Sequence, residues 1–127
     1  MGRSKKKTLP FDKEGGVIAI QRALLSSDNY ESLRAQSKVL ITLLHIHWRN
    51  EKTVDYGIRE ASQKIPCDRR TAIRAFNELQ ERGFITCAEH SIFSSRTQSK
   101  SRSWRLNWLP FNDHPPSNEW KKWGGDN

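Results

Sequence analysis

Long apolar stretches are missing from this sequence. No run approaches the roughly 20 apolar residues that a membrane-spanning helix requires, and the basic N-terminus is not followed by the apolar core of a secretion signal. We therefore expect no membrane-spanning segment and a protein that works in the cytoplasm.

Cysteine is scarce as well. Cys67 and Cys87 are the only two, and neither belongs to a C-x-x-C pair. Such isolated cysteines are typical of reduced thiols in a reducing compartment. A zinc site would need four ligands at compatible spacing. His45 and His47 cannot share a metal, because two residues apart on a helix their side chains point about 200° away from each other. We expect no metal.

Sequence motifs of catalysis are absent too. The chain has no glycine-rich loop of the kind that cradles phosphate, no cluster of metal ligands and no recognisable nucleophile–base pair. We therefore expect a protein that is not an enzyme and needs no cofactor.

Positive charge is what the sequence has in excess. With 127 residues, a net charge of +8 and a pI of about 9.9, the chain is long enough for one basic domain. This charge favours a polyanionic partner, nucleic acid first and an anionic membrane second. Charge alone leaves RNA open, but the sequence shows no aromatic stacking platform typical of RNA-binding domains.

A central stretch predicts two helices joined by a tight turn. The first begins after Gly57 and ends before Pro66, because a proline disfavours helical geometry in the residue before it. Asp68 offers a side-chain oxygen to free backbone donors, which predicts an N-cap. The second helix then covers residues 69–82 and stops at Gly83, which tolerates positive φ.

The second predicted helix has two different faces. Its apolar face collects Ala72, Ala75, Phe76 and Leu79. Its opposite face collects Arg70, Arg74, Asn77 and Glu81, with Arg69 and Thr71 beside it on the first turn. Guanidinium and amide groups pair with guanine and adenine edges in the major groove. The pattern predicts a helix-turn-helix with residues 69–82 as the recognition helix; an ordinary solvated face is the alternative.

Upstream, residues 34–50 predict a long helix. Seven of the ten positions from Val39 to Trp48 are apolar. A polar stripe completes the helix, made of Lys38, Thr42, His45 and Arg49. A helix this apolar is enclosed on most sides, either as the central core helix or by packing on a second subunit. His45 is expected at the surface, in the stripe.

Shorter elements surround this helix. We expect a β-prone run at residues 17–20, a single helical turn capped at residues 27–30 and ending near Leu33, and a short strand at residues 53–56.

Two further strands follow the second helix, at residues 84–90 and 103–109. In the latter, Trp104, Leu106 and Trp108 are expected to point one way, and Arg105 and Asn107 the other. The serine-rich loop 91–102 between them has no acidic residue and carries Arg96, Lys100 and Arg102. A long basic hairpin loop after a recognition helix predicts a wing on the sugar-phosphate backbone or in the minor groove; a flexible loop with incidental charge is the alternative.

The order helix, short strand, helix, helix, hairpin predicts a winged helix-turn-helix. This is an α/β fold that is mainly α, with a three-helix core and a C-terminal β-hairpin wing. Residues 58–105 hold ten basic side chains against five acidic ones, so more than half of the net charge lies on this unit. We place the domain at residues 15–110.

Two polar segments flank the predicted domain. Residues 1–14 form a basic arm whose cations either contact phosphate or only solubilise the chain. These cations are Arg3, Lys5, Lys6 and Lys7. Residues 111–127 form a tail rich in proline, tryptophan and glycine. Trp120 and Trp123 can form one amphipathic turn, which we expect to dock on the domain rather than on a partner protein.

Several segments resemble bacterial and phage winged helix-turn-helix DNA-binding proteins. They are I-R-E-A-S from Ile58, T-A from Thr71, and E-L-Q-E-R-G-F-I from Glu78. Upstream, V-I-A-I, L-L-S-S and Y-E-S-L look like small phage regulators and like the N-terminal domains of phage and plasmid replication initiators. The resemblance covers about residues 17–109. The sequence departs from the family at Gly57, where serine commonly caps, and in its P-C turn.

The resemblance implies sequence-specific binding to double-stranded DNA without chemistry. Base contacts would fall to Arg70, Arg74 and Asn77, and backbone contacts to Arg69, Thr71 and the wing cations. A nucleoid-associated transcriptional regulator is our first expectation, a replication-initiator-type or DNA-metabolism module the second, and a protein-interaction scaffold the third. A homodimer is compatible with the family, although the long C-terminal helix by which winged-helix repressors dimerise does not follow the wing.

Overall fold

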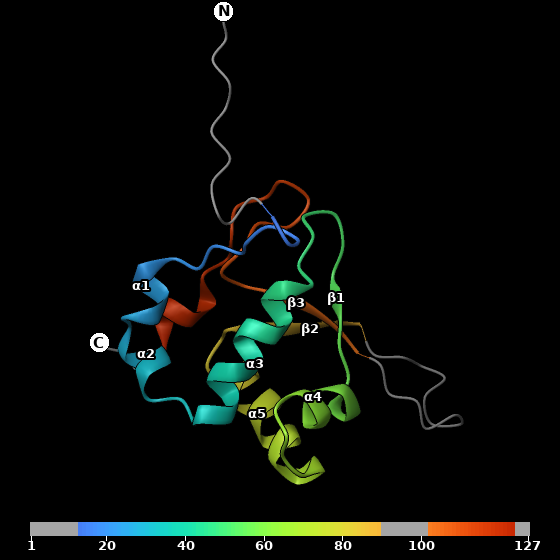
Figure 1. Cartoon of the computed structure of the whole chain (residues 1–127). Helices are drawn as coiled ribbons and strands as arrows, with labels where there is room; N and C mark the ends of the chain where they lie inside the picture. The colour runs from blue at the N-terminus through green and yellow to red at the C-terminus, as the bar shows by residue number, and fades with distance from the viewer. Residues whose placement is uncertain (1–12, 90–101, 124–127) are drawn as a thin grey trace, which may run out of the picture.

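The structure is a computed structural model that describes residues 13–89 and 102–123. In this part of the chain, five α-helices and three strands make a mixed α/β fold that is mainly helical (Figure 1). The helices are α1 (Arg22–Leu25), α2 (Asp28–Glu31), α3 (Ala35–Ile46), α4 (Ile58–Lys64) and α5 (Arg69–Glu81). The strands are β1 (Val54–Asp55), β2 (Ile85–Glu89) and β3 (Ser103–Leu106), and a 3-10 helix, η2 (Glu119–Lys122), comes last. The coarse fold class predicted from the sequence is confirmed.

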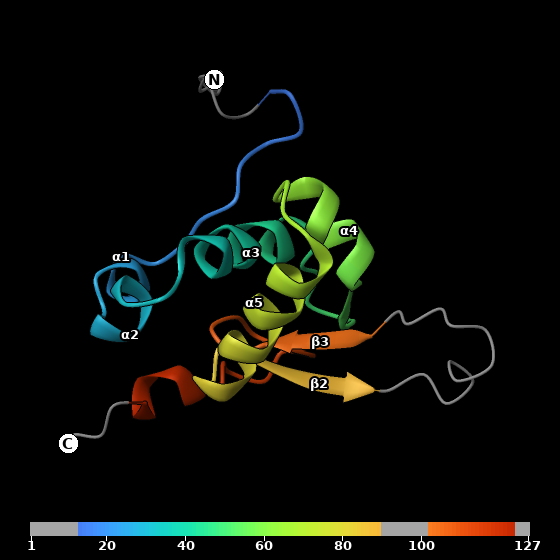
Figure 2. The same ribbon diagram turned by 90° about the horizontal axis from the view of Figure 1, so that it is seen from below.

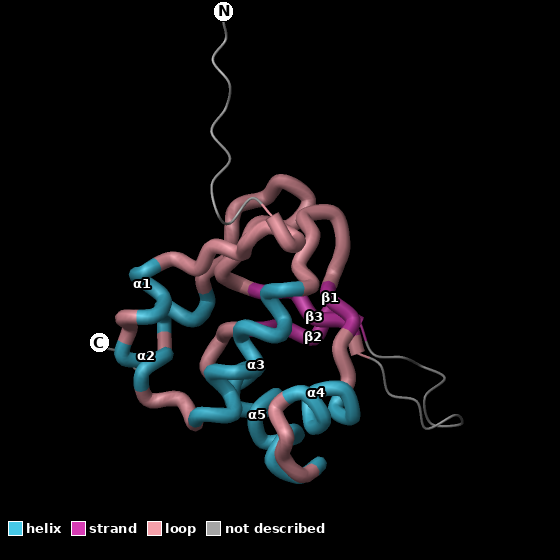
Figure 3. Tube along the Cα trace, viewed as in Figure 1, coloured by secondary structure: helices cyan, strands magenta, loops and turns pink. Residues whose placement is uncertain are grey.

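Helix α5 is the central element. In Figure 2 it lies between α3 and α4 on one side and strands β2 and β3 on the other. The strands form one antiparallel sheet in the order β1-β3-β2, gathered on one side of the molecule in Figure 3. Val54 of β1 pairs with Trp104 of β3, and Thr86 of β2 pairs with Arg105 of β3. Strand β3 therefore ties the segment before α4 to the segment after α5.

The core follows from the apolar face of α5, as the sequence predicts. Ala72, Ala75, Phe76 and Leu79 are all buried. They meet α3 through its buried residues, Leu40, Ile41 and Leu44. On the sheet side, the ring of Phe76 stacks on that of Trp104, with centroids 5.2 Å apart. Burying these side chains is the main source of stability for a chain of this size.

Local signals set the ends of α5. The Asp68 side chain accepts a hydrogen bond from the backbone N–H of Thr71 at 2.9 Å, which confirms the predicted N-cap. Gly83 follows the helix with a φ of +84°. An added Cβ there would also lie 2.9 Å from the carbonyl carbon of Glu119. Gly83 is therefore required both by its backbone conformation and by the close approach of the tail.

Helix α3 is shorter and less enclosed than predicted. It ends at Ile46 rather than near residue 50, and His47 caps it. Trp48 lies beyond the helix, where its indole N–H donates to the carbonyl of Pro110 at 3.1 Å. The apolar pattern runs on past the helix because Trp48 packs against the core from a turn. Val39 and Ile46 are 42% and 55% exposed, so this chain alone does not enclose the helix on most sides. Packing of these residues on a second subunit stays a prediction.

The predicted surface position of His45 is also wrong. The side chain is buried, and its Nδ1 accepts a hydrogen bond from the indole N–H of Trp108 at 3.2 Å. Trp108, far along the chain, supplies the hydrogen-bond partner that allows the imidazole to be buried. The polar stripe on α3 is therefore interrupted at His45.

Two predictions about strands fail. Residues 17–20 form no strand, and Val17 is 61% exposed; a β-prone run needs a neighbouring strand to pair with. Asn107 does not point outward but is buried beyond the end of β3. Its amide donates to the carbonyl of Gly83 at 2.9 Å and to the hydroxyl of Thr86 at 3.0 Å. The side chain of Asn107 thereby links the end of β3 to the start of β2.

The tail docks on the rest of the chain through η2, as expected. Trp120 is 3% exposed, and its ring stacks on Phe84 at a centroid distance of 6.0 Å and an interplanar angle of 8°. Trp123 stays 41% exposed, with the guanidinium of Arg82 4.3 Å from its ring centroid. The tail up to residue 123 therefore packs as part of the same body as the helices.

Candidate nucleic-acid interface

The outer face of α5 collects the predicted base-reading residues. Arg70, Arg74 and Asn77 are all exposed, and Arg69 is exposed beside them. The structure thus brings four of the predicted contact residues together on one helical surface. They can reach a partner without displacing any part of the core.

Within the described part of the chain, no carboxylate forms an ion pair with these arginines. Within the described residues, the ion pairs are Arg82 with Glu78 at 3.4 Å and Lys122 with Glu119 at 3.7 Å. Neither pair involves the outer face of α5. Glu81 is exposed at the other end of the helix, so α5 is cationic along its first half and acidic at its end. The first half is therefore the part suited to an anion.

Asp68 is the acidic residue beside these arginines. Hydrogen bonds from the hydroxyl and the backbone N–H of Thr71 hold the pKa of its carboxyl below the usual range, and the charges of Arg70 and Arg74 add to the effect. Asp68 is therefore ionised at neutral pH. Thr71, a predicted backbone contact, is turned toward this carboxylate, so its donors serve the helix cap.

A partly buried polar network holds α5 in place. The carboxylate of Glu78 accepts hydrogen bonds from the hydroxyl of Ser37 at 2.6 Å and from the backbone N–H of Arg34 at 3.2 Å. Glu78, on the neighbouring helix α5, thus accepts hydrogen bonds from donors at the start of α3. Arg82 donates to the carbonyl of Asn29 at 3.0 Å and ties the end of α5 to α2. The exposed arginines lie near the start of α5, and these contacts anchor the helix toward its other end.

The predicted wing contributes one described contact residue. Arg102, just before β3, is half-buried, and its carbonyl accepts a hydrogen bond from the N–H of Tyr56 at 3.2 Å. Arg102 and Asn77 line the same recess, which has a volume of about 310 Å³. The other predicted backbone-contacting cations lie outside the described residues: Arg96, Lys100, Arg3, Lys5, Lys6 and Lys7.

Sequence reasoning missed the apolar residues of this recess. Ile73 lies on α5 and Ile58 on α4, and both are half-buried rather than enclosed. A signal was present in the sequence, because Ile73 is an isoleucine outside the apolar face of α5. Ile73 lines the recess only because Trp104 of β3 lies nearby. The spacing of residues along α5 does not predict the position of Trp104.

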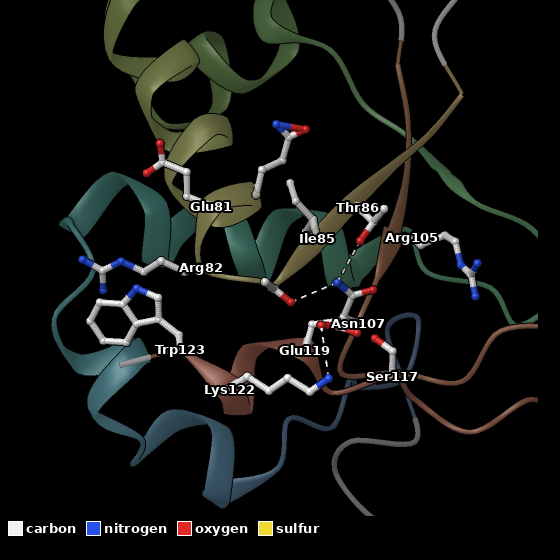
Figure 4. A pocket seen from close by; sticks show the side chains of 12 residues that line it. Glu81, Arg82, Ile85, Thr86, Arg105, Asn107, Ser117, Glu119, Lys122 and Trp123 are labelled. Atoms are coloured by element: carbon white, nitrogen blue, oxygen red, sulfur yellow. Dashed lines mark hydrogen bonds and ion pairs between the residues drawn. The ribbon is translucent and has the colours of Figure 1, made fainter. Parts of the chain in front are cut away.

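A second and larger groove lies at the carboxyl end of α5 (Figure 4). Its volume is about 560 Å³, and it separates Glu81 and Arg82 from the η2 residues Glu119 and Lys122. Trp123 forms part of its wall, under the guanidinium of Arg82. Acidic and basic groups both line this groove, so it does not extend the cationic surface of α5.

Other classes of site find little support in the described ranges. Among residues 13–89 and 102–123, no group of three histidine, cysteine, aspartate or glutamate side chains is placed to hold a metal ion. None of the helices described is long and apolar enough to span a bilayer. Comparisons with protein-family models, curated proteins and solved structures find nothing that matches this chain. The chemistry of the outer face of α5 is therefore the strongest indication of function.

Proposed function

We propose that this protein is a winged helix-turn-helix protein that binds double-stranded DNA and reads its sequence with α5. The observation that carries the proposal is the outer face of that helix. It displays Arg70, Arg74 and Asn77, and no carboxylate of the described residues forms an ion pair with either arginine. Guanidinium and amide groups on a helix are the donors that read guanine and adenine in the major groove.

The arrangement of the elements supports this proposal. The order is α3, β1, α4, α5, β2, β3, and β3 pairs with both other strands. Residues 65–68 link α4 to α5, a length typical of helix-turn-helix motifs. In such motifs the second helix is the one placed in the groove.

Binding in this proposal involves no chemistry. Arg70, Arg74 and Asn77 read base edges. Arg69 and Arg102 contact phosphates, and Arg96 and Lys100 add to these contacts. Each neutralised phosphate releases counterions, so the affinity falls as salt rises. Each bidentate arginine contact supplies about 1–3 kcal/mol of discrimination between bases.

A transcriptional regulator of the nucleoid, acting by occupying an operator, is the role we propose. A replication-initiator-type module would use the same interface but bind several direct repeats. The binding stoichiometry on a native fragment separates the two roles, because a single operator takes a fixed, small number of chains.

Protein recruitment through the tail is a second candidate function. Its support is the 560 Å³ groove beside the exposed Trp123, at the end of α5 away from the arginines. A partner bound there would leave the outer face of α5 accessible to DNA.

The test is DNA binding measured by fluorescence anisotropy at two salt concentrations. The duplexes are a random sequence and fragments that flank the protein's own gene. We expect salt-sensitive binding that prefers one fragment. Changing Arg70→Ala together with Arg74→Ala should weaken binding to that fragment by at least about tenfold.

An Arg22→Ala/Arg34→Ala double variant is the matched control. It removes the same charge from exposed arginines of α1 and the start of α3, outside the proposed interface. This control should lose only the small part of the affinity that depends on net charge. Equal losses in the two double variants, or no preference among duplexes, would contradict sequence reading by α5.

A further inference from the structure

The recess between α5 and β3 has an aromatic floor that reading of DNA does not use. Phe76 and Trp104 stack there at an interplanar angle of 20°, and Tyr56 lies beside them. The indole N–H of Trp104 donates to the carbonyl of Tyr56 at 3.1 Å, which fixes the position of the indole. The floor is therefore rigid and apolar, because its polar atom is already satisfied within the protein.

The walls of the recess are aliphatic on two sides. Ile58 at the start of α4 and Ile73 on α5 are both half-buried. With a volume of about 310 Å³, the recess is at the lower end of the sizes found for small-molecule sites. A flat apolar body of one or two rings fits such a space.

Two polar groups converge on this apolar recess. Asn77 and Arg102 line it, and within the described residues neither side chain has a hydrogen-bond or ion-pair partner. Arg102 is half-buried, and a guanidinium pairs best with a planar anion that accepts two parallel hydrogen bonds. Carboxylate is the simplest group of that kind.

We propose that this recess binds a small aromatic anion, whose ring lies between the isoleucines and whose carboxylate pairs with Arg102. Asn77 and Arg102 are also contacts of the proposed DNA interface, so the anion and DNA exclude each other. That exclusion depends on the proposed function, whereas binding of the anion does not. The recess is thus a site at which a metabolite of this class releases the protein from DNA.

The DNA backbone itself is a poorer occupant of the recess. A phosphodiester is hydrated, and proteins contact it from their surface with cations and backbone N–H groups. Entering a space floored by Phe76 and Trp104 would remove that hydration without replacing it. A carboxylate on an aromatic ring avoids this cost, because only its ring enters the apolar part.

The probe we choose is 2-naphthoate, with 2-naphthamide as its uncharged counterpart of the same shape. Each is titrated into the full chain while backbone amide resonances are followed by NMR. We expect 2-naphthoate to bind with a Kd on the order of 1 mM or tighter, the affinity attainable by a ligand of this size. The largest shifts should fall on Ile58, Ile73 and Asn77, and 2-naphthamide should bind at least about fivefold more weakly.

Three variants test the assignment. Arg102→Gln should make the two probes bind equally, because the partner of the carboxylate is lost. Arg105→Gln is the matched control, since it removes the same charge from an exposed position of β3 outside the recess, and it should leave both affinities unchanged. Ile73→Phe should fill the recess and abolish binding of both probes. Ile58→Phe serves the same purpose if Ile73→Phe fails to fold by circular dichroism.

Several results would overturn the proposal. These are shifts located away from the recess, equal binding of the two probes to the unaltered chain, and unaltered 2-naphthoate binding in the filled variant. The proposal would also be overturned if duplex DNA, rather than 2-naphthoate, shifted the amide resonances of the recess.

Measuring DNA binding in the presence of 2-naphthoate separates this proposal from the proposed function. In the unaltered chain 2-naphthoate should weaken DNA binding, and in Ile73→Phe it should have no effect. Failure of the chain to bind any duplex would refute the proposed function while leaving the anion site standing. Anion binding in the recess with unchanged DNA affinity would refute the exclusion alone.

Discussion

His45 shows what burial does to a single titratable residue. Its Nδ1 accepts the indole N–H of Trp108, so the proton of the neutral imidazole is on Nε2. Removal from water lowers the pKa of His45 from its ordinary value of 6.5. A second proton would occupy Nδ1 and end the hydrogen bond. The folded state therefore favours the neutral form.

This preference predicts a loss of stability in mild acid. Because the folded pKa is lowered, the unfolded chain binds the proton first, and the contribution of His45 is complete above about pH 6.5 and declines as the pH falls below it. Each unit by which the pKa is lowered corresponds to about 1.4 kcal/mol at most. Urea unfolding at about pH 7.5 and about pH 5.5 measures the difference.

His45→Gln is the matching variant, because glutamine offers Trp108 an acceptor that does not titrate. We expect the unaltered chain to lose more stability than His45→Gln between the two pH values. Identical losses would show that other groups cause the pH dependence.

At the scale of elements, α5 is positioned by polar contacts as well as by its apolar face. Glu78 joins α5 to the start of α3, through the hydroxyl of Ser37 and the N–H of Arg34. Ser37 is fully buried, so loss of the carboxylate would leave its hydroxyl without that partner. The placement of α5 therefore depends on a residue on its inner side.

Glu78→Ala should destabilise the fold by about 2–3 kcal/mol, because it removes charge-assisted hydrogen bonds and leaves the buried hydroxyl of Ser37 without that partner. Glu81→Ala is the matched control, an exposed glutamate on the same helix, expected to change stability by less than about 0.5 kcal/mol. Guanidinium chloride unfolding compares them. Similar effects in the two variants would mean that the contacts of Glu78 contribute little.

At the scale of the molecule, the tail is part of the folded body. Trp120 covers Phe84, and the amide of Asn29 donates to the carbonyl of Trp120 at 2.9 Å from α2. The tail thereby connects α2, the end of α5 and the base of the hairpin. Its docking buries apolar area that the helices and the sheet would otherwise leave exposed.

Trp120→Ala should therefore cost about 3–5 kcal/mol, the usual penalty for truncating a buried tryptophan. Trp123→Ala should cost no more than about 1 kcal/mol, since it loses only an exposed contact with Arg82. Thermal and chemical unfolding of both variants tests this difference. A stable Trp120→Ala chain would show that the tail contributes little to the core.

The sequence by itself determined the features that depend on neighbouring residues. The two faces of α5 follow from the helical period, and its ends follow from Asp68 and Gly83, which act within one turn of the helix. The same short-range rules locate α4, β2 and β3 to within a few residues. For the candidate interface, they predict which side chains of α5 face solvent.

Only the tertiary structure decided the rest. Burial of His45 depends on Trp108, 63 residues further along the chain, and burial of Asn107 depends on Gly83, 24 residues before it. The recess exists because β3 brings Arg102 beside Asn77, residues that no local period relates. A polar group is buried only where a partner satisfies it, and the chain's path through space chooses that partner.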